Sequence, residues 1–166
     1  IRLSFEDSGK SILGTYVDEG FFTFSGTKAI LGRTLQKADL AAGASPVTVI
    51  STQVWENDYS SNKNVIGMSV IVNDIVTEIV GVMPHGYRFP GSSHIWLPIK
   101  KSMIKTSAKN PNSVRAYARV KPNVSLAKAK QVLSQQLNTI YQQSVVEYDL
   151  EKGNKTIQLL SFPFAQ

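Results

Sequence analysis

The chain has 166 residues, of which 42% are hydrophobic, 18% are charged and none is cysteine. This composition supports one folded domain or two small subdomains, and it excludes disulfides, thiol nucleophiles and cysteine-ligated zinc. The formal net charge is +6, but the lysines are scattered and cluster only at Lys100, Lys101 and Lys105, so we expect a dispersed solvated surface and no nucleic-acid site.

The first part of the chain predicts a strand, a short helix and a polar loop. Residues 10–17 (KSILGTYV) have the composition of a strand. Asp18 is expected to cap a helix over residues 19–26, which ends at a glycine. Its apolar anchors are three phenylalanines, Phe21, Phe22 and Phe24. The polar segment 35–45 follows and is a candidate hinge between subdomains.

The middle of the chain predicts mostly β-structure. Residues 46–51 form a short run rich in valine and isoleucine, which indicates a buried strand. Residues 65–72 and 75–83 are two β-branched runs separated only by Asn73-Asp74, a pair that tolerates positive φ and predicts a tight hairpin. A turn of helix after the first strand is expected to be capped by a hydroxyl residue, Ser51 or Thr52.

An irregular segment and a linker follow the hairpin. Residues 84–99 contain many prolines and glycines, so we expect an excursion without regular structure. Its anchors are expected to be apolar and aromatic, namely Tyr87, Phe89, Trp96 and Ile99. Residues 101–113 are polar and contain Asn110-Pro111, which predicts a linker and a second candidate hinge at 102–113.

The last part predicts a second strand–helix–strand unit. Residues 114–120 (VRAYARV) alternate as a strand does, and residues 155–162 are a further strand. Ser125 is expected to cap a long helix over about 126–143. Its apolar face carries Leu126, Ala129, Leu133, Leu137 and Ile140. Strand–helix–strand units at both ends and a β-rich middle, at about 34–111, predict an α+β protein with a β-rich insertion.

No residues form a recognisable catalytic, cofactor-binding or metal-binding set. The two histidines, His85 and His94, belong to no hydrolase or metalloprotease motif and have no acidic residue at ligand spacing. Gly9-Lys10-Ser11 resembles the end of a phosphate loop, but Ser4 stands where the upstream glycine is needed. We therefore predict that the chain is no enzyme and holds no cofactor or metal, and no partner-binding residue can be named.

The aromatic residues leave two interpretations open. They are Trp55, Tyr59, Tyr87, Phe89 and Trp96. Such residues most often fill the core of a small β-rich module, and we expect this role here. Lining a sugar or peptide site is the alternative.

Several short motifs, taken together and in order, resemble a known family. They are Leu31-Gly32-Arg33, Val65-Ile66-Gly67, Val80-Gly81-Val82-Met83-Pro84, Gly86-Tyr87-Arg88-Phe89-Pro90, Trp96-Leu97-Pro98 and Ala118-Arg119-Val120-Lys121-Pro122. The chain is similar here to the periplasmic core domain of MacB-like ABC transporter permeases, within the FtsX-like permease superfamily. Asn123 stands where that family often has glycine, and asparagine still permits a turn.

The resemblance implies an α+β fold of two subdomains. A porter-like subdomain is expected from residues 1–33 and 112–166, with a smaller β-rich subdomain inserted at 34–111. Gly81 and Gly86 are expected to allow a close backbone approach and a turn. None of the motif residues is chemically reactive, so the motifs are expected to hold a shape.

The resemblance also implies a place and a role. No stretch of the sequence approaches the roughly 20 apolar residues of a membrane helix, and no signal peptide opens it, so we expect an excised fragment. The implied place is the periplasmic side of the bacterial inner membrane. The implied role is non-catalytic: contact with periplasmic partners or substrate, and transmission of ATPase-driven motion.

The expected partners follow from the same resemblance. They are the permease's own transmembrane helices, a second permease protomer, the ABC ATPase acting through the membrane part, and a periplasmic adaptor or lipoprotein, but no nucleic acid. A free-standing periplasmic module that binds a peptide or sugar is the alternative function.

Overall fold

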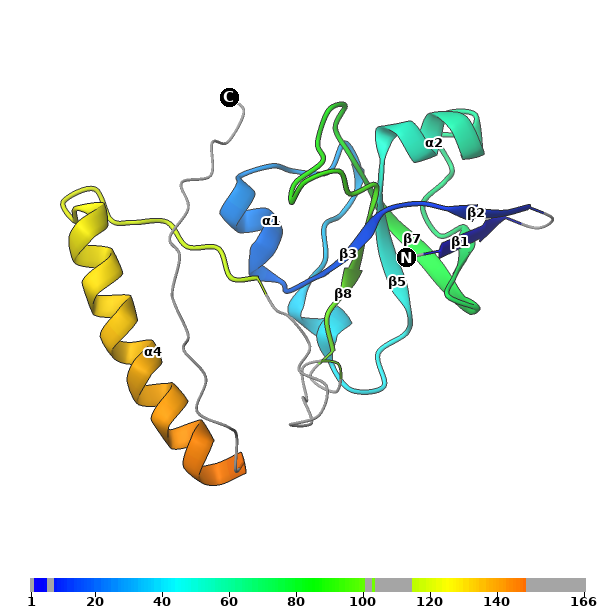
Figure 1. Ribbon diagram of the computed structural model, residues 1–166. Helices are drawn as coiled ribbons and strands as arrows, with labels where there is room; N and C mark the ends of the chain where they lie inside the picture. The colour runs from blue at the N-terminus through cyan, green and yellow to red at the C-terminus, as the bar shows by residue number, and fades with distance from the viewer. Residues whose placement is uncertain (1, 6–7, 101–102, 104–114, 149–166) are drawn as a thin grey trace. The chain divides into compact units, whose positions relative to one another are not determined.

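The computed structural model describes residues 2–5, 8–100, 103 and 115–148 (Figure 1). The chain divides into two compact units, residues 1–104 and 105–166. The boundary falls within the predicted linker at 101–113, most of which lies outside the described residues. The strand predicted at 155–162 lies outside them as well.

A mixed eight-stranded sheet forms the frame of the first unit (Figure 1). Its strand order is β2-β1-β6-β7-β5-β8-β3, and β4 pairs with β7 off this path. The strands are β1 (Arg2–Phe5), β2 (Ser8–Ser11), β3 (Gly14–Val17), β4 (Leu31–Gly32), β5 (Val47–Ser51), β6 (Ser69–Val72), β7 (Ile75–Met83) and β8 (Ile95–Pro98). This sheet with a few helices confirms the predicted α+β class.

Strand β5 lies between β7 and β8 inside the sheet, and all five of its residues are buried. It runs parallel to β7 on one side and antiparallel to β8 on the other. Burial on both faces explains its continuous Val-Thr-Val-Ile run, without the alternation of a half-exposed strand. The core around it consists of β-branched residues and one leucine: Ile50, Val54, Val65, Val70, Val72, Ile79, Val82, Ile95 and Leu97.

The predicted hairpin is present as β6 and β7. Val72 pairs with Ile75, and the turn residues Asn73 and Asp74 have φ of 50° and 63°. Two successive positive φ values match the tight turn whose twist suits a hairpin. Residues 65–68, with a turn at 66–67, are not part of β6, so the first strand of the hairpin is shorter than predicted.

Three short helices with described bounds lie in the first unit. They are α1 (Gly20–Ser25), the 3-10 helix η1 (Lys37–Leu40) and α2 (Thr52–Tyr59). The predicted cap of α2 is confirmed, because the Ser51 hydroxyl accepts a hydrogen bond from the Val54 N–H at 3.2 Å. The predicted Asp18 cap of α1 is wrong. Glu19 is the residue at the helix N-cap, and no side chain caps it.

Two strand predictions near the edges of the sheet need correction. The strand expected at 10–17 is split, with residues 12–13 between β2 and β3. Residues 95–98, expected to be irregular, form strand β8, which pairs with both β3 and β5. Val17 lies opposite Pro98 in the parallel β3–β8 pair.

The described part of the second unit consists of an extended segment and one long helix. Helix α4 (Leu126–Tyr148) begins after Ser125, whose hydroxyl accepts from the Lys128 N–H at 3.2 Å, as predicted. It continues five residues beyond the predicted end. Residues 115–120 have no regular structure, so the strand predicted at 114–120 is wrong over these residues. Leu126 and Leu137 on the predicted apolar face are exposed.

The strands on either side of residue 33 belong to one sheet. Strand β3, before residue 33, pairs with β8, which follows that residue. Strand β4, also before it, pairs with β7. The assignment of 1–33 and 112–166 to a porter-like subdomain, with 34–111 as an insertion, stays a prediction.

Candidate functional site

The backbone of Arg33 crosses β7 at Gly81. A side chain at Gly81 would collide with the Arg33 carbonyl, and a side chain at Gly32 would collide with the Val80 carbonyl. Gly32 also has a φ of 65°, which L-residues rarely adopt. Two of the motifs that carry the resemblance are thus in contact, because the glycine of each removes the side chain that would separate the backbones.

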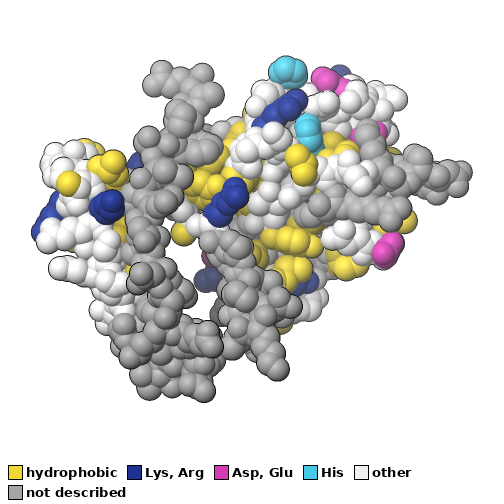
Figure 2. Space-filling view, in the orientation of Figure 1, with side chains coloured by type: hydrophobic (Ala, Val, Ile, Leu, Met, Phe, Trp, Pro, Cys, Tyr) yellow, Lys and Arg dark blue, Asp and Glu magenta, His cyan; other side chains and the backbone are white. Residues whose placement is uncertain are grey.

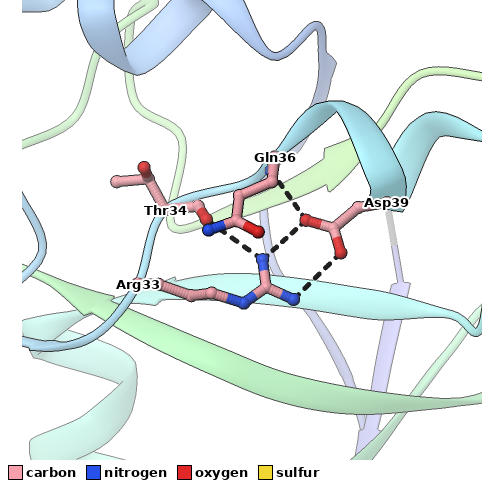
Figure 3. A network of polar contacts seen from close by, with 4 residues as sticks. All are labelled: Arg33, Thr34, Gln36 and Asp39. Carbon is pink, nitrogen blue, oxygen red and sulfur yellow. Dashed lines mark hydrogen bonds and ion pairs between the residues drawn. The ribbon is translucent and has the colours of Figure 1, made fainter.

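Arg33 then fixes the loop that follows it (Figure 3). Its guanidinium donates from Nη1 to Asp39 Oδ2 at 2.7 Å and from Nη2 to Oδ1 at 2.9 Å. The Gln36 N–H donates to Asp39 Oδ2 at 2.7 Å. Two parallel bonds orient both groups, so this pair holds η1 in place.

The Asp39 carboxylate is buried and kept ionised by these contacts. Burial alone raises its pKa, but the hydrogen bonds from Arg33 and from the Gln36 backbone, with the nearby Arg33 charge, lower the pKa below its usual value. A buried carboxylate with its acceptors occupied by donors has a structural role. The Arg33–Asp39 pair is therefore part of the frame and not a reactive site.

An aromatic cluster joins α1 to the segment after β7. Phe21 stacks on Phe89 with ring centroids 4.9 Å apart, and Phe22 lies 6.2 Å from both Tyr87 and Trp96. Phe21, Phe22, Phe89 and Trp96 are buried, and Trp96 is 0% exposed. Rings at these separations attract one another beyond the area they bury, so α1 and residues 87–89 form one packed unit.

The polar atoms of this cluster are also paired. Trp96 Nε1 donates to the Phe89 carbonyl at 2.7 Å, and the Tyr87 hydroxyl donates to Ser25 Oγ at 2.9 Å. Burial raises the pKa of Tyr87 to about 12. These bonds fix the path of the segment despite its lack of regular structure.

The prediction that aromatic residues fill the core is confirmed for Phe89 and Trp96. Tyr87, Trp55 and Tyr59 are half-buried. Trp55 and Tyr59 pack against the edge of the core, and Trp55 Nε1 donates to the Asn62 carbonyl at 2.8 Å. The aromatic residues therefore do not gather into one open ligand site.

The two histidines lie at one hollow, although they are nine residues apart in the sequence. Its volume is about 270 Å³. Both histidine side chains, coloured cyan, lie on the same face of the molecule (Figure 2). His85 is exposed in the turn expected for it, and His94 is half-buried with Nδ1 3.2 Å from Ser51 Oγ. Other side chains at the hollow include Gln53, Glu56 and Arg88.

This hollow was not predicted from the sequence. Arg88 Nη2 donates to Gln53 Oε1 at 2.9 Å and so joins the segment after β7 to the start of α2. Residues 84 and 86–88 belong to the family motifs and His85 lies between them, but the other lining residues come from the end of β5, from α2 and from the residue before β8, so no pattern in the sequence brings them together. Within the described part of the chain, no three histidine, aspartate or glutamate side chains are grouped to hold a metal ion.

The family of the chain is established by sequence comparison. The model of the MacB-like periplasmic core domain matches residues 2–136. The chain therefore belongs to the MacB-like periplasmic core domain family, the extracytoplasmic domain of MacB-like ABC transporter permeases. No curated protein sequence matches the chain. Among the described residues, no helix is both long and apolar enough to cross a membrane.

Two solved structures share the fold. The periplasmic region of MacB from Actinobacillus actinomycetemcomitans is 20% identical, with a TM-score of 0.61 over 85% of this chain and 63% of that one. The extracellular domain of the noncanonic ABC-type transporter YknZ from Gram-positive bacteria is also 20% identical, with a TM-score of 0.50 over 66% of this chain and 54% of that one. The chain thus spans less than two thirds of either structure.

Proposed function

We propose that this domain contacts a periplasmic partner or substrate and transmits ATPase-driven motion from the membrane part of a permease, without catalysing a reaction itself. Membership of the MacB-like periplasmic core domain family, over residues 2–136, is the observation that carries the proposal. The proposed place is the periplasmic side of the bacterial inner membrane. A free-standing peptide- or sugar-binding module is not favoured, because the family is a transporter domain.

The proposed partners are those of a permease domain. They are its own transmembrane helices, a second permease protomer, the ABC ATPase through the membrane part, and a periplasmic adaptor or lipoprotein. Nucleic acid is not among them, since the basic residues show no run interleaved with aromatics.

The contacts of Ser51 support a non-catalytic role. Ser51 and His94 are within hydrogen-bond distance, as a nucleophile and its base would be. The Ser51 side chain is buried, however, and its oxygen accepts the Val54 N–H at the start of α2. A hydroxyl used as a helix cap is poorly placed to attack a substrate.

The domain is also expected to bind no ATP, because Ser4 stands where a phosphate loop needs its upstream glycine. Calorimetry is expected to detect no saturable ATP binding by the domain.

Relative motion is proposed between the two compact units, at the 102–113 segment. The other candidate hinge, residues 35–45, is held by the Arg33–Asp39 pair, by the buried Leu35 and by a hydrogen bond from Lys100 Nζ to the Ala44 carbonyl at 3.0 Å. These contacts favour a fixed connection there. A rigid first unit is the property that a body transmitting motion needs.

Crosslinking in the full-length permease tests this proposal. These 166 residues contain no cysteine, so in a permease whose other cysteines are removed, Lys63→Cys and Lys128→Cys provide one reactive site in each unit. We expect a crosslink between them to stop transport while ATP binding persists. The control is a pair within the first unit, Lys28→Cys and Lys37→Cys, whose crosslink leaves transport unchanged. Normal transport by protein shown to be crosslinked between units would refute the proposal.

A further inference from the structure

Donor groups of the first unit converge at the hollow beside α2. Arg88, His85 and Gln53, which can donate hydrogen bonds from their side chains, are among its lining residues, and His94 lies at its edge with Ser51. Because Gln53 Oε1 accepts from Arg88, the Gln53 amide group has its N–H atoms available to donate elsewhere. The one acidic side chain in the lining is Glu56. The hollow is thus rich in donors for an oxygen acceptor.

Both walls of the hollow are held by contacts with the rest of the first unit. Tyr87 is bonded to Ser25 and packed on Phe22, which holds the 84–88 turn against α1. On the other wall, Ser51 caps α2 and lies 3.2 Å from His94 Nδ1. The backbone of both walls is therefore held before a ligand arrives, so less binding free energy is lost in ordering it.

Size and charge define what fits. Ligand pockets for drug-sized molecules have volumes of roughly 300–1,000 Å³, so a hollow of about 270 Å³ suits a single small group. Arginine binds carboxylates through two parallel hydrogen bonds. Arg88 is the one permanently positive side chain in the lining and Glu56 opposes any anion, so a single negative charge suits the hollow better than a dianion such as phosphate.

We propose that this hollow binds the carboxylate group of a small molecule or of a peptide C-terminus, with Arg88 as its principal ligand. His85 and Gln53 supply further donors, and Glu56 limits the affinity. This inference does not depend on the proposed function, because it concerns the isolated chain.

Amide chemical shifts of the isotopically labelled 166-residue chain test the proposal. The probes are acetate, N-acetylglycine and the neutral N-acetylglycinamide, with chloride at equal ionic strength as the reference. We expect saturable shifts at residues 53, 86 and 88 with both carboxylates, and none with the neutral amide. Tighter binding of N-acetylglycine than of acetate would identify a peptide C-terminus as the source, and equal binding would identify a free carboxylate.

Three variants make the test specific. Arg88→Gln is expected to weaken carboxylate binding about tenfold or more, and Glu56→Gln to strengthen it roughly two- to fivefold. Lys63→Gln removes an exposed charge elsewhere and leaves binding unchanged. All three positions are exposed, so unchanged amide spectra away from the hollow confirm folding. Equal shifts in wild type and Arg88→Gln, or no saturation in the wild type, would overturn the proposal.

Discussion

The carbonyl of Arg33 lies against the Cα of Gly81, so closely that no side chain fits between the two backbones. Arg33 follows β4, and Gly81 lies within β7 opposite Gly32. The same arginine turns its side chain to Asp39. Arg33 therefore contacts β7 with its backbone and holds the following loop, which contains η1, with its side chain.

Replacing Gly81 by alanine tests this crossing. We expect Gly81→Ala to lower the free energy of unfolding by about 1–3 kcal/mol or more, because backbone cannot move aside as a flexible side chain can. Gly20→Ala is the matched control, since its new methyl would lie 3.5 Å from the nearest side-chain atom, at the start of α1. Urea unfolding measures both. A Gly81→Ala variant as stable as the control would show that the contact is absent in solution.

Trp96 is expected to be the most costly aromatic residue to remove. It is fully buried and bonded to the Phe89 carbonyl, so Trp96→Ala should destabilise the first unit by ~3–5 kcal/mol. Trp55→Ala should cost less, because Trp55 is half-buried. Thermal unfolding ranks the two variants. A loss below ~1 kcal/mol for Trp96→Ala would contradict its burial and revive the sugar- or peptide-site interpretation.

The Arg33–Asp39 pair predicts an acid-sensitive part of the stability. The pKa of Asp39 is lower in the folded chain than in the unfolded one, where it is about 3.9. The ionised form therefore stabilises the fold above that pH, and this contribution is lost as the pH falls through the folded pKa. Asp39→Asn should destabilise the domain at neutral pH, and its difference from wild type should shrink below about pH 4.

A double-mutant cycle isolates the same pair. Arg33→Ala and Asp39→Ala should each destabilise the domain, with a coupling of about 1 kcal/mol in urea unfolding. The Arg33 side chain is 39% exposed, which moderates that value. Additive effects of the two substitutions would show that the pair contributes nothing.

Tyr59 and Tyr87 should titrate late. Burial raises the pKa of Tyr59 and Tyr87 to about 12. A tyrosine whose pKa is raised by folding contributes stability that is fully present below the unfolded pKa of about 10. This contribution is lost as the pH rises through the folded pKa. Absorbance titration should show one late ionisation fewer in Tyr87→Phe than in the wild type. An unchanged number of late ionisations in Tyr87→Phe would contradict the raised pKa of Tyr87.

Local chemistry was sufficient to predict several elements. Asn73-Asp74 predicts the hairpin because both residues tolerate the positive φ that the turn requires. Ser51 predicts the start of α2 because its hydroxyl satisfies a backbone N–H that the helix leaves unpaired. Gly81 was expected to allow a close backbone approach, but neither its partner Arg33 nor the matching approach at Gly32 was predicted.

Long-range pairing was not predictable in the same way. Residues 95–98 form a strand only because β3 and β5 supply hydrogen bonds on either side, from about 80 and 45 residues earlier. Conversely, the alternation of 115–120 predicted a strand that has no pairing partner among the described residues. The hollow depends on the same long-range contacts, since Ser51 and His94 meet across the sheet.

The proposed motion between the two units can be measured directly by electron spin resonance. Spin labels at Lys63→Cys and Lys128→Cys, in the full-length permease with its ATPase, report the distance between units with and without bound nucleotide. Labels at Lys28→Cys and Lys37→Cys report the first unit alone. We predict that nucleotide changes the first distance distribution and leaves the second unchanged. An inter-unit distribution that is the same in both nucleotide states would contradict the transmission of motion through this domain.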